Sequence, residues 1–266
     1  MNASKLHWLE FLVSMTEKEI KARYKHAVLG FLWILINPLL QMLVIGLVFR
    51  FFVPVQVDNY FLFLFAGLLP WNFFSYSLSK TTPMVLNERN LIKKASFPRE
   101  VIIFSIILSN LFHLFVALGL FIIILLGQKI LSGEASFVEI LFFTLRFLWI
   151  IPITLWLTIL VSGFSLLFSS LNVKYRDVNF AVQAILPLWF YATPIVYTLS
   201  LLPPSLRHVL YLNPVTTVLE LYQAIFLEQP ISFSWAQVAS ILMGVVIFFI
   251  GFYFFKKEEP FFDDWV

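Results

Sequence analysis

The stretch Ala27–Phe49, AVLGFLWILINPLLQMLVIGLVF, runs for 23 residues without Asp, Glu, Lys or Arg. About 20 apolar residues are enough to cross the hydrocarbon core of a bilayer as a helix. Further stretches of this kind, each at least 21 residues long, predict an all-α integral membrane protein with six transmembrane helices. These further stretches are Asn59–Ser79, Val101–Gln128, Phe147–Val173, Val178–Leu206 and Gln229–Phe255.

The composition excludes a soluble globular protein. Hydrophobic residues make up 61% of the 266 residues and charged residues only 12%, whereas about 25% charged residues is usual in soluble domains. Six spans and their short loops account for the whole chain, so we expect a single membrane domain, residues 1–266, without a soluble catalytic domain. The absence of Cys from the sequence excludes disulfides and thiolate metal sites.

The basic residues predict the topology. Cytoplasmic loops of membrane proteins collect Lys and Arg, and 14 of the 18 basic residues fall before the first, third and fifth stretches and after the sixth. Both termini are therefore expected in the cytoplasm. These residues are Lys5, Lys18, Lys21, Arg23, Lys25, Lys80, Arg89, Lys93, Lys94, Arg99, Lys174, Arg176, Lys256 and Lys257.

Residues 4–25 predict an amphipathic helix that lies along the cytoplasmic surface of the membrane. Trp8 and Phe11 are expected at the depth of the lipid headgroups. The alternative is a short solvated helix with a few stray apolar residues. The apolar side chains recur at helical spacing and are Leu9, Leu12, Val13 and Ile20, with Thr16 among them.

The largest cytoplasmic loop contains a charged segment, residues 87–100, that ends in a helix start at Pro98 and Glu100. A surface helix between two spans suits docking to a cytoplasmic partner. The alternative is a solvated connector that its charge keeps in the cytoplasm. The candidate docking residues are Asn87, Glu88, Arg89, Asn90, Leu91, Ile92, Lys93 and Lys94.

Prolines interrupt the region between residues 187 and 228, so one straight helix over 178–206 is implausible. The apolar piece Val215–Leu227 is only 13 residues long and carries Glu220, a length that suits a re-entrant segment. We expect a fifth crossing followed by short segments at 198–228 that narrow a channel from outside. The candidate gate residues are Pro203, Pro214 and Glu220.

Several kinds of chemistry are missing from the sequence. It contains no G-x-x-x-x-G-K-[ST] run and therefore no ATP-binding P-loop of that type. Asp, Glu, Lys and Arg are absent from the centres of the spans, although ion-coupled carriers need such a group to bind their ion. Proton coupling through this chain is therefore not expected, and the energy for transport must come from elsewhere.

Uncharged polar and aromatic side chains form stripes within the spans. They have two interpretations: close packing between helices, or the lining of a neutral polar pore in which aromatic faces contact a sugar chain. Most aromatic residues are expected in lipid or at its interface. The candidate lining residues are Asn37, Gln41, Trp71, Asn72, Trp189 and Tyr191.

Three groups of motifs carry a resemblance to a known family. The first is RYKHAVLGFLW at Arg23–Trp33, followed by Asn37-Pro38; the second is NERNLIKK at Asn87–Lys94, with FPRE at Phe97–Glu100. The third group is Lys174–Val178, Pro194-Ile195 and Leu212–Pro214. In this order they resemble the permease subunit of the ABC-2 type polysaccharide exporters, in the O-antigen and teichoic-acid branch.

This resemblance implies a bacterial inner-membrane protein in which two copies of the chain form one channel. Two separate ATPase subunits would bind ATP and Mg²⁺, so this chain would bind no cofactor or metal, catalyse no reaction and contact no nucleic acid. Segment 87–100 would be the coupling helix. The substrate would be a polysaccharide on polyprenyl pyrophosphate, and the cationic residues Arg23, Lys25 and Arg176 are candidates to meet its pyrophosphate. Their alternative role is topology and contact with anionic lipid.

Two other functions stay open. An ABC-2 exporter of a small lipid or drug would share the fold. A membrane-embedded glycosyltransferase acting on polyprenyl carriers would need acidic catalytic residues, and the outer loops offer five acids without a pairing pattern. These acids are Asp58, Glu134, Glu139, Glu220 and Glu228.

Overall fold

The computed structural model describes residues 3–25, 29–52, 57, 59–94, 97–132, 136–230 and 234–262. This part of the chain is helical and contains no strand. The α-helices are α1 (Ala3–Tyr24), α2 (Trp33–Phe52), α3 (Tyr60–Thr81), α4 (Met84–Asn87), α5 (Arg89–Lys94), α6 (Glu100–Leu131), α7 (Phe137–Arg146), α8 (Ile150–Lys174), α9 (Asp177–Tyr191), α10 (Pro204–Leu210), α11 (Pro214–Phe226) and α12 (Trp235–Glu258). Short 3₁₀ helices are η1 (Gly30–Leu32), η2 (Phe147–Trp149), η3 (Leu199–Leu201) and η4 (Glu259–Phe261).

Five helical segments in the described residues are long and apolar enough to cross a membrane. They correspond to the first, second, third, fourth and sixth stretches predicted from the sequence. The fourth begins ten residues earlier than expected, because α7, η2 and α8 run on without a break from Phe137 to Lys174. The protein is therefore a multi-pass membrane protein. The segments are Gly30–Phe49, Tyr60–Thr81, Glu100–Leu131, Phe137–Lys174 and Trp235–Phe261.

The expected fifth span differs most from a simple crossing. Helix α9 has 15 residues, which gives a length of about 22 Å, shorter than the roughly 30 Å of a bilayer core. Pro194 explains why the helix stops at Tyr191, since a residue before proline avoids the helical region. A straight helix over 178–206 is thus absent, as the prolines indicated, and the count of six crossings stays a prediction.

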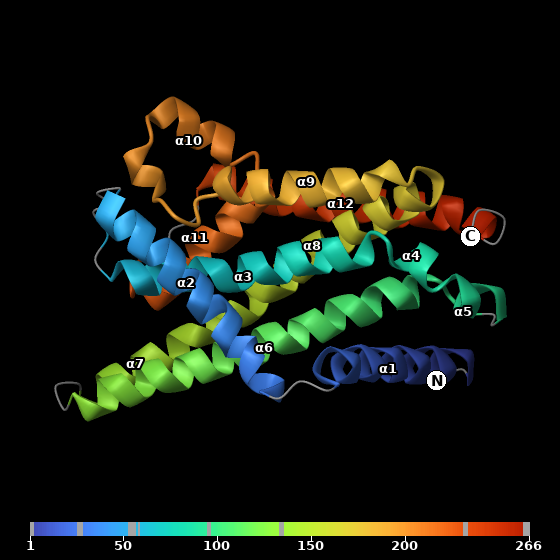
Figure 1. Cartoon of the computed structure of the whole chain (residues 1–266). Coiled ribbons are helices and arrows are strands. Elements are labelled where there is room, and N and C mark those ends of the chain that lie inside the picture. Colours follow the sequence, from blue (N-terminus) through green and yellow to red (C-terminus); the bar gives the residue numbers. More distant parts are fainter. Residues whose placement is uncertain are drawn as a thin grey trace.

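The two ends of the molecule carry different elements (Figure 1). Helices α1, α4 and α5 lie toward the same end as the C-terminus, while α10, the last turn of α6 and the first turn of α7 lie toward the other. This arrangement agrees with both termini on one side of the membrane. Which side faces the cytoplasm stays a prediction from the basic residues.

Cysteine labelling tests this orientation, and the natural chain provides a background without cysteine. With the cytoplasm at the end of α5, Ser132→Cys is expected to react with an impermeant maleimide in intact cells. Asn90→Cys, in α5 at the opposite end, is expected to react only after the cells are opened. Labelling in the reverse order would overturn the predicted topology.

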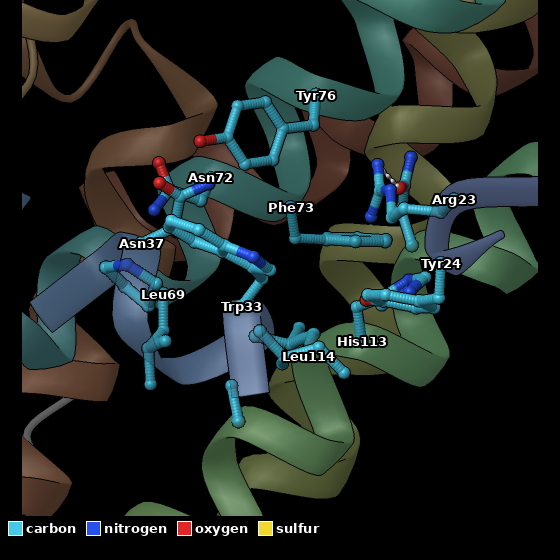
Figure 2. Close-up of a pocket in the computed structure, with 14 residues that line it drawn as sticks. Arg23, Tyr24, Trp33, Asn37, Leu69, Asn72, Phe73, Tyr76, His113 and Leu114 are labelled. Atoms are coloured by element: carbon cyan, nitrogen blue, oxygen red, sulfur yellow. Dashed lines mark hydrogen bonds between the residues drawn. The ribbon is translucent and has the colours of Figure 1, made fainter. Parts of the chain in front are cut away.

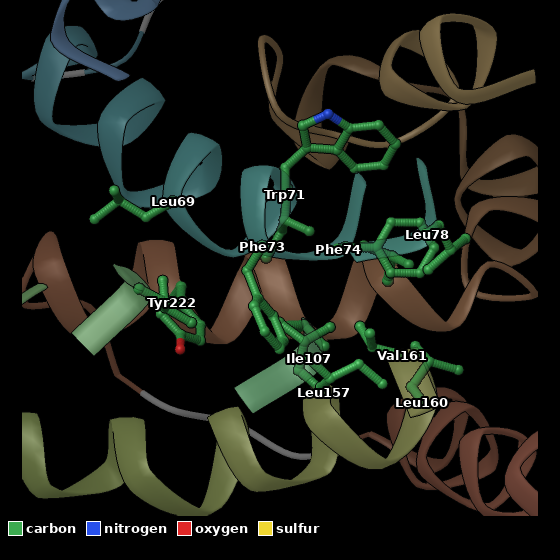
Figure 3. Close-up of a cluster of buried hydrophobic side chains, with 14 of the residues drawn as sticks. Leu69, Trp71, Phe73, Phe74, Leu78, Ile107, Leu157, Leu160, Val161 and Tyr222 are labelled. Atoms are coloured by element: carbon green, nitrogen blue, oxygen red, sulfur yellow. The ribbon is translucent and has the colours of Figure 1, made fainter. Parts of the chain in front are cut away.

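Helix α3 lies at the centre of the fold. In the most hydrophobic 18-residue stretch of α3, 72% of the residues are buried, compared with 17% in the corresponding stretch of α6. Figure 3 shows side chains of α3 meeting those of α6, α8 and α11. Burying such a large side chain contributes roughly 1.5–3 kcal/mol of stability. In a bilayer the surrounding lipid is itself apolar, so much of this free energy must come from packing between the helices. The labelled residues are Leu69, Trp71, Phe73, Phe74, Leu78, Ile107, Leu157, Leu160, Val161 and Tyr222.

Helices α8 and α12 approach each other through glycines. A Cβ atom added to Gly163 would lie 2.6 Å from the Cα of Phe248, and one added to Gly251 would collide with the Gly163 carbonyl. Only residues without a side chain allow this contact between backbones. Ser162 and Ser165 of α8 are also buried, which supports the packing interpretation of the polar stripe in this span.

The expected outer piece Val215–Leu227 forms helix α11, which the Asn213 side chain caps by accepting from the Val215 amide at 3.1 Å. Helix α11 packs against α3, α8 and α12, and Tyr222 is fully buried in it. A segment too short to cross a membrane survives at that depth only when protein surrounds it. Deleting Val215–Leu227 would therefore remove part of the core and would not report on a gate alone.

Candidate functional site

The expected docking segment forms two short helices, α4 and α5, with a break at Glu88. Ile92 anchors α5, because its side chain is only 2% exposed. Most polar residues of the segment are open to solvent. Helix α5 lies beyond the membrane-spanning helices at the end of the molecule (Figure 1). These exposed residues are Asn87, Arg89, Asn90, Lys93 and Lys94.

Helix α1 joins this segment to the transmembrane helices. The Lys18 ammonium lies 2.8 Å from the Glu88 carboxylate, and the Lys80 ammonium of α3 lies 2.5 Å from the carboxylate of Glu19. Glu19 is only 4% exposed, and a carboxylate so buried needs a charged partner. The role of Glu19 could not be inferred from the sequence, because its partner is 61 residues away.

Helix α1 buries one face against the rest of the protein. Leu12, Met15 and Glu19 are buried, while Leu9 and Val13 are 44% and 64% exposed. Helix α1 packs against α6, so the buried residues are three and four positions apart and face this neighbour. Leu9 and Val13 of the expected apolar face lie outside this contact, and the position of α1 along the membrane surface stays a prediction.

A cavity of about 400 Å³ lies where α1, α2, α3 and α6 meet. Figure 2 shows Arg23, Tyr24 and His113 on one side and Asn37 and Asn72 on the other. Burial raises the pKa of the Tyr24 phenol, so this ring stays neutral at physiological pH. The remaining lining residues are Trp33, Ile34, Pro38, Leu69, Phe73, Tyr76, Asn110, Leu114 and Ala117.

Arg23 is the charged residue of this cavity. Its guanidinium donates to the Asn110 Oδ1 at 3.0 Å, and the Asn110 amide donates in turn to the Ser77 hydroxyl at 3.1 Å. This chain of bonds fixes the end of α1 to α6 and α3. Because a guanidinium carries five N–H donors, the bond to Asn110 leaves donors for a further acceptor.

A second cavity of about 380 Å³ opens between α2, α3 and α9 and shares Asn72 and Tyr76 with the first. Asn72 donates to the Gln41 Oε1 at 2.9 Å, and Gln41 donates to the Tyr76 hydroxyl at 3.2 Å. Across the cavity, Gln183 of α9 donates to the Ser79 hydroxyl at 2.7 Å. The result is an uncharged surface of amides and hydroxyls that can exchange hydrogen bonds with water or sugar hydroxyls.

The structure brings together most of the predicted lining residues. Asn37 and Asn72 line the first cavity, and Gln41, Trp71, Asn72 and Tyr191 line the second. Trp189 lines neither cavity; its ring packs against Phe74 at 5.0 Å between centroids. Tyr76 and Gln183 also line the second cavity and were not among the predicted residues.

The three cationic residues predicted to meet a headgroup do not share a cavity. Arg23 lines the first cavity, while Lys25 and Arg176 line neither of the two. Both are exposed, Lys25 in the turn after α1 and Arg176 at the start of α9. Charge alone placed all three at one boundary, but only Arg23 lies within a concave site.

The candidate gate residues lie in α11 and directly before α10. Pro203 precedes α10 and Pro214 begins α11, while Glu220 lines a polar cavity of about 640 Å³. The Tyr211 hydroxyl donates to the Glu220 Oε1 at 3.0 Å, and the Gln237 amide donates to its Oε2 at 3.4 Å. The carboxylate therefore has polar neighbours, which a lipid-facing position would not supply.

Comparison with known proteins places this architecture in a family. Residues 10–227 match the family described as ABC-2 type transporter, and the chain belongs to this family. The chain is similar to proteins named O-antigen export system permease protein RfbA. The one from Myxococcus xanthus is 32% identical over 250 residues, which cover 93% of this chain and 92% of the relative. One from Klebsiella pneumoniae is 30% identical over 249 residues, with the same coverage of both chains.

Proposed function

We propose that this chain is the channel-forming subunit of an ATP-driven exporter that carries lipid-linked polysaccharide out of the bacterial cytoplasm. The observation that carries the proposal is the similarity to O-antigen export permeases over 93% of the chain. The family model alone would fit exporters of other substrates. The inner membrane, with both termini in the cytoplasm, is the location this function requires.

The proposed assembly contains two copies of this chain and two ATPase subunits. A separate ATPase is needed because the sequence has no P-loop. The exposed residues of α5 support a docking role, since Arg89, Lys93 and Lys94 offer charge to a partner while Ile92 holds the helix in place. ATP and Mg²⁺ belong to the partner subunits in this proposal.

The polar surface of α2, α3 and α9 is the proposed wall of the channel. Gln41, Asn72, Tyr76 and Gln183 offer neutral hydrogen-bonding groups, and Tyr191 adds an aromatic face that is 63% exposed. A polymer must bind weakly at many places in order to slide, as conduction requires of any pore. Neutral groups suit this better than charges, which would hold a substrate in one place.

The remaining candidate residues have proposed roles at the two ends of the channel. Arg23, Lys25 and Arg176 would meet the pyrophosphate of the polyprenyl carrier at the cytoplasmic end. Pro203, Pro214 and Glu220 would shape a gate at the outer end. Because α11 packs deep in the core, the gate would open by movement of α10 and η3 more readily than by movement of α11.

A bulky side chain in the channel wall tests the proposal. Gln183→Trp, on the exposed face of α9 that lines the second cavity, is expected to lower export to about a tenth or less, equivalent to about 1.4 kcal/mol of added barrier. The matched variant Leu188→Trp changes an exposed α9 residue outside this cavity and should leave export nearly unchanged. Export is measured as polymer accumulated outside the inner membrane, with protein level as the control. Equal export by both variants would contradict the proposed wall.

A further inference from the structure

The first cavity is amphipathic. Arg23, Asn110 and His113 supply polar groups at one part of its wall, and Leu69, Leu114 and Ala117 supply an apolar part. A ligand that fits such a wall has a polar head and an apolar continuation. The volume of about 400 Å³ is within the usual range for a small-molecule site and suits a headgroup better than a whole lipid.

The charge of the cavity selects an anion. Among the described residues that line it, Arg23 is the one with a permanent charge, and none is acidic. The guanidinium donates to Asn110 and makes no ion pair within the described part of the chain. A guanidinium with donors to spare binds a phosphate in a two-pronged geometry.

His113 gives a second and independent indication of a ligand. Its Nδ1 lies 2.5 Å from the Ser109 carbonyl oxygen, so Nδ1 carries the hydrogen and Nε2 is left as an acceptor. Nε2 is buried and has no partner among the described residues, and His113 is only 8% exposed. Buried polar groups almost always have a partner from protein, water or ligand.

The surroundings of the cavity face lipid. Phe31 and Leu32, directly before the lining residue Trp33, are 54% and 60% exposed, and Phe112 beside His113 is 41% exposed. Exposed apolar side chains on a transmembrane helix are in contact with acyl chains or with a second subunit. A lipid whose chains lie on this surface can place its headgroup in the cavity.

We propose that this cavity binds the phosphate headgroup of a membrane lipid, with Arg23 on the phosphate and His113 Nε2 accepting a hydrogen bond from a headgroup hydroxyl. The Tyr24 ring lies 5.4 Å from the imidazole between centroids and also lines the cavity. Two membrane lipids share this chemistry: a glycerophospholipid such as phosphatidylglycerol, and a polyprenyl pyrophosphate that carries a sugar. For the polyprenyl carrier, this site rests on the proposed function, which places Arg23 at the pyrophosphate; binding of a glycerophospholipid does not depend on that function.

The test compares two lipids of equal charge by native mass spectrometry of the purified full-length protein in detergent. Phosphatidylglycerol carries headgroup hydroxyls, and phosphatidylethanol carries none. The natural protein is expected to retain phosphatidylglycerol about fivefold more tightly, as one net hydrogen bond allows. Arg23→Gln should weaken both lipids by about tenfold or more. Lys21→Gln, which removes one exposed positive charge from the same helix, should weaken neither.

The His113 variants test the hydroxyl contact. His113→Phe should bind the two lipids equally, whereas His113→Gln, which keeps an acceptor, should retain part of the preference. Thermal melts of each variant in the same detergent show whether the fold is intact. Equal binding of the two lipids by the natural protein, or equal losses with Arg23→Gln and Lys21→Gln, would overturn the proposal.

A competition experiment then identifies the source of the phosphate. Undecaprenyl pyrophosphate bearing one sugar is added to the protein loaded with phosphatidylglycerol. Displacement that Arg23→Gln abolishes assigns the cavity to the polyprenyl carrier, and retention of phosphatidylglycerol assigns it to a bound glycerophospholipid. Both results uphold a phosphate headgroup site.

Discussion

Arg89→Glu is expected to abolish ATP-driven export while the protein still inserts into the membrane at normal levels. Arg89 begins α5, is exposed, and makes no ion pair among the described residues, so the substitution leaves the fold of this chain intact. At a docking surface, however, it places a charge of the wrong sign against the partner. Truncating or mismatching a charge at an interface costs about 2–5 kcal/mol, which is enough to weaken an ATPase complex more than thirtyfold.

The measurement is co-purification of the ATPase subunits together with ATP turnover stimulated by the complex. Lys257→Glu is the matched control, because it reverses an exposed charge at the same end of the molecule, near the end of α12. Glu88→Lys would be a poorer choice, since Glu88 pairs with Lys18 and its loss also removes a contact between α1 and this segment. Normal complex formation and normal stimulated turnover with Arg89→Glu would return α5 to the role of a solvated connector.

The sequence was sufficient to predict the transmembrane helices, because their composition is set by contact with lipid. Long uncharged stretches have few alternatives to a transmembrane helix, and the family resemblance that three groups of motifs indicated is confirmed by the match over residues 10–227. The start of α6 at Glu100 was also predictable, because Pro98 and Glu100 are local signals of a helix start.

Contacts between distant segments could not be predicted. Glu19 looks like one more charge on a solvated face, and only the fold brings Lys80 to it. Likewise, the cavity of Arg23 needs His113 from α6, 90 positions further along the chain, and Asn72 from α3. Periodicity identifies which face of a helix is apolar but not which neighbour covers it, and the contact of α1 with α6 therefore could not be predicted.

Transport is expected to stop completely when the ATPase partner is omitted or when its hydrolysis is blocked. This second large effect has two causes in the chain itself. The sequence contains no P-loop, and the described spans place no Asp, Glu, Lys or Arg at their centres to bind a coupling ion. Dissipating the proton gradient should therefore leave the rate almost unchanged, in contrast to an ion-coupled carrier.

Reconstitution of this chain in vesicles tests the central claim most directly. Polyprenyl-linked polysaccharide is placed on the side of α5, and its appearance on the other side is measured with the ATPase and ATP, with the ATPase and a non-hydrolysable ATP analogue, and without the ATPase. A channel subunit that works with a separate ATPase predicts movement of the polymer only in the first condition, with or without a proton ionophore. Movement of the polymer in the absence of the ATPase, or its loss with the ionophore alone, would contradict the account.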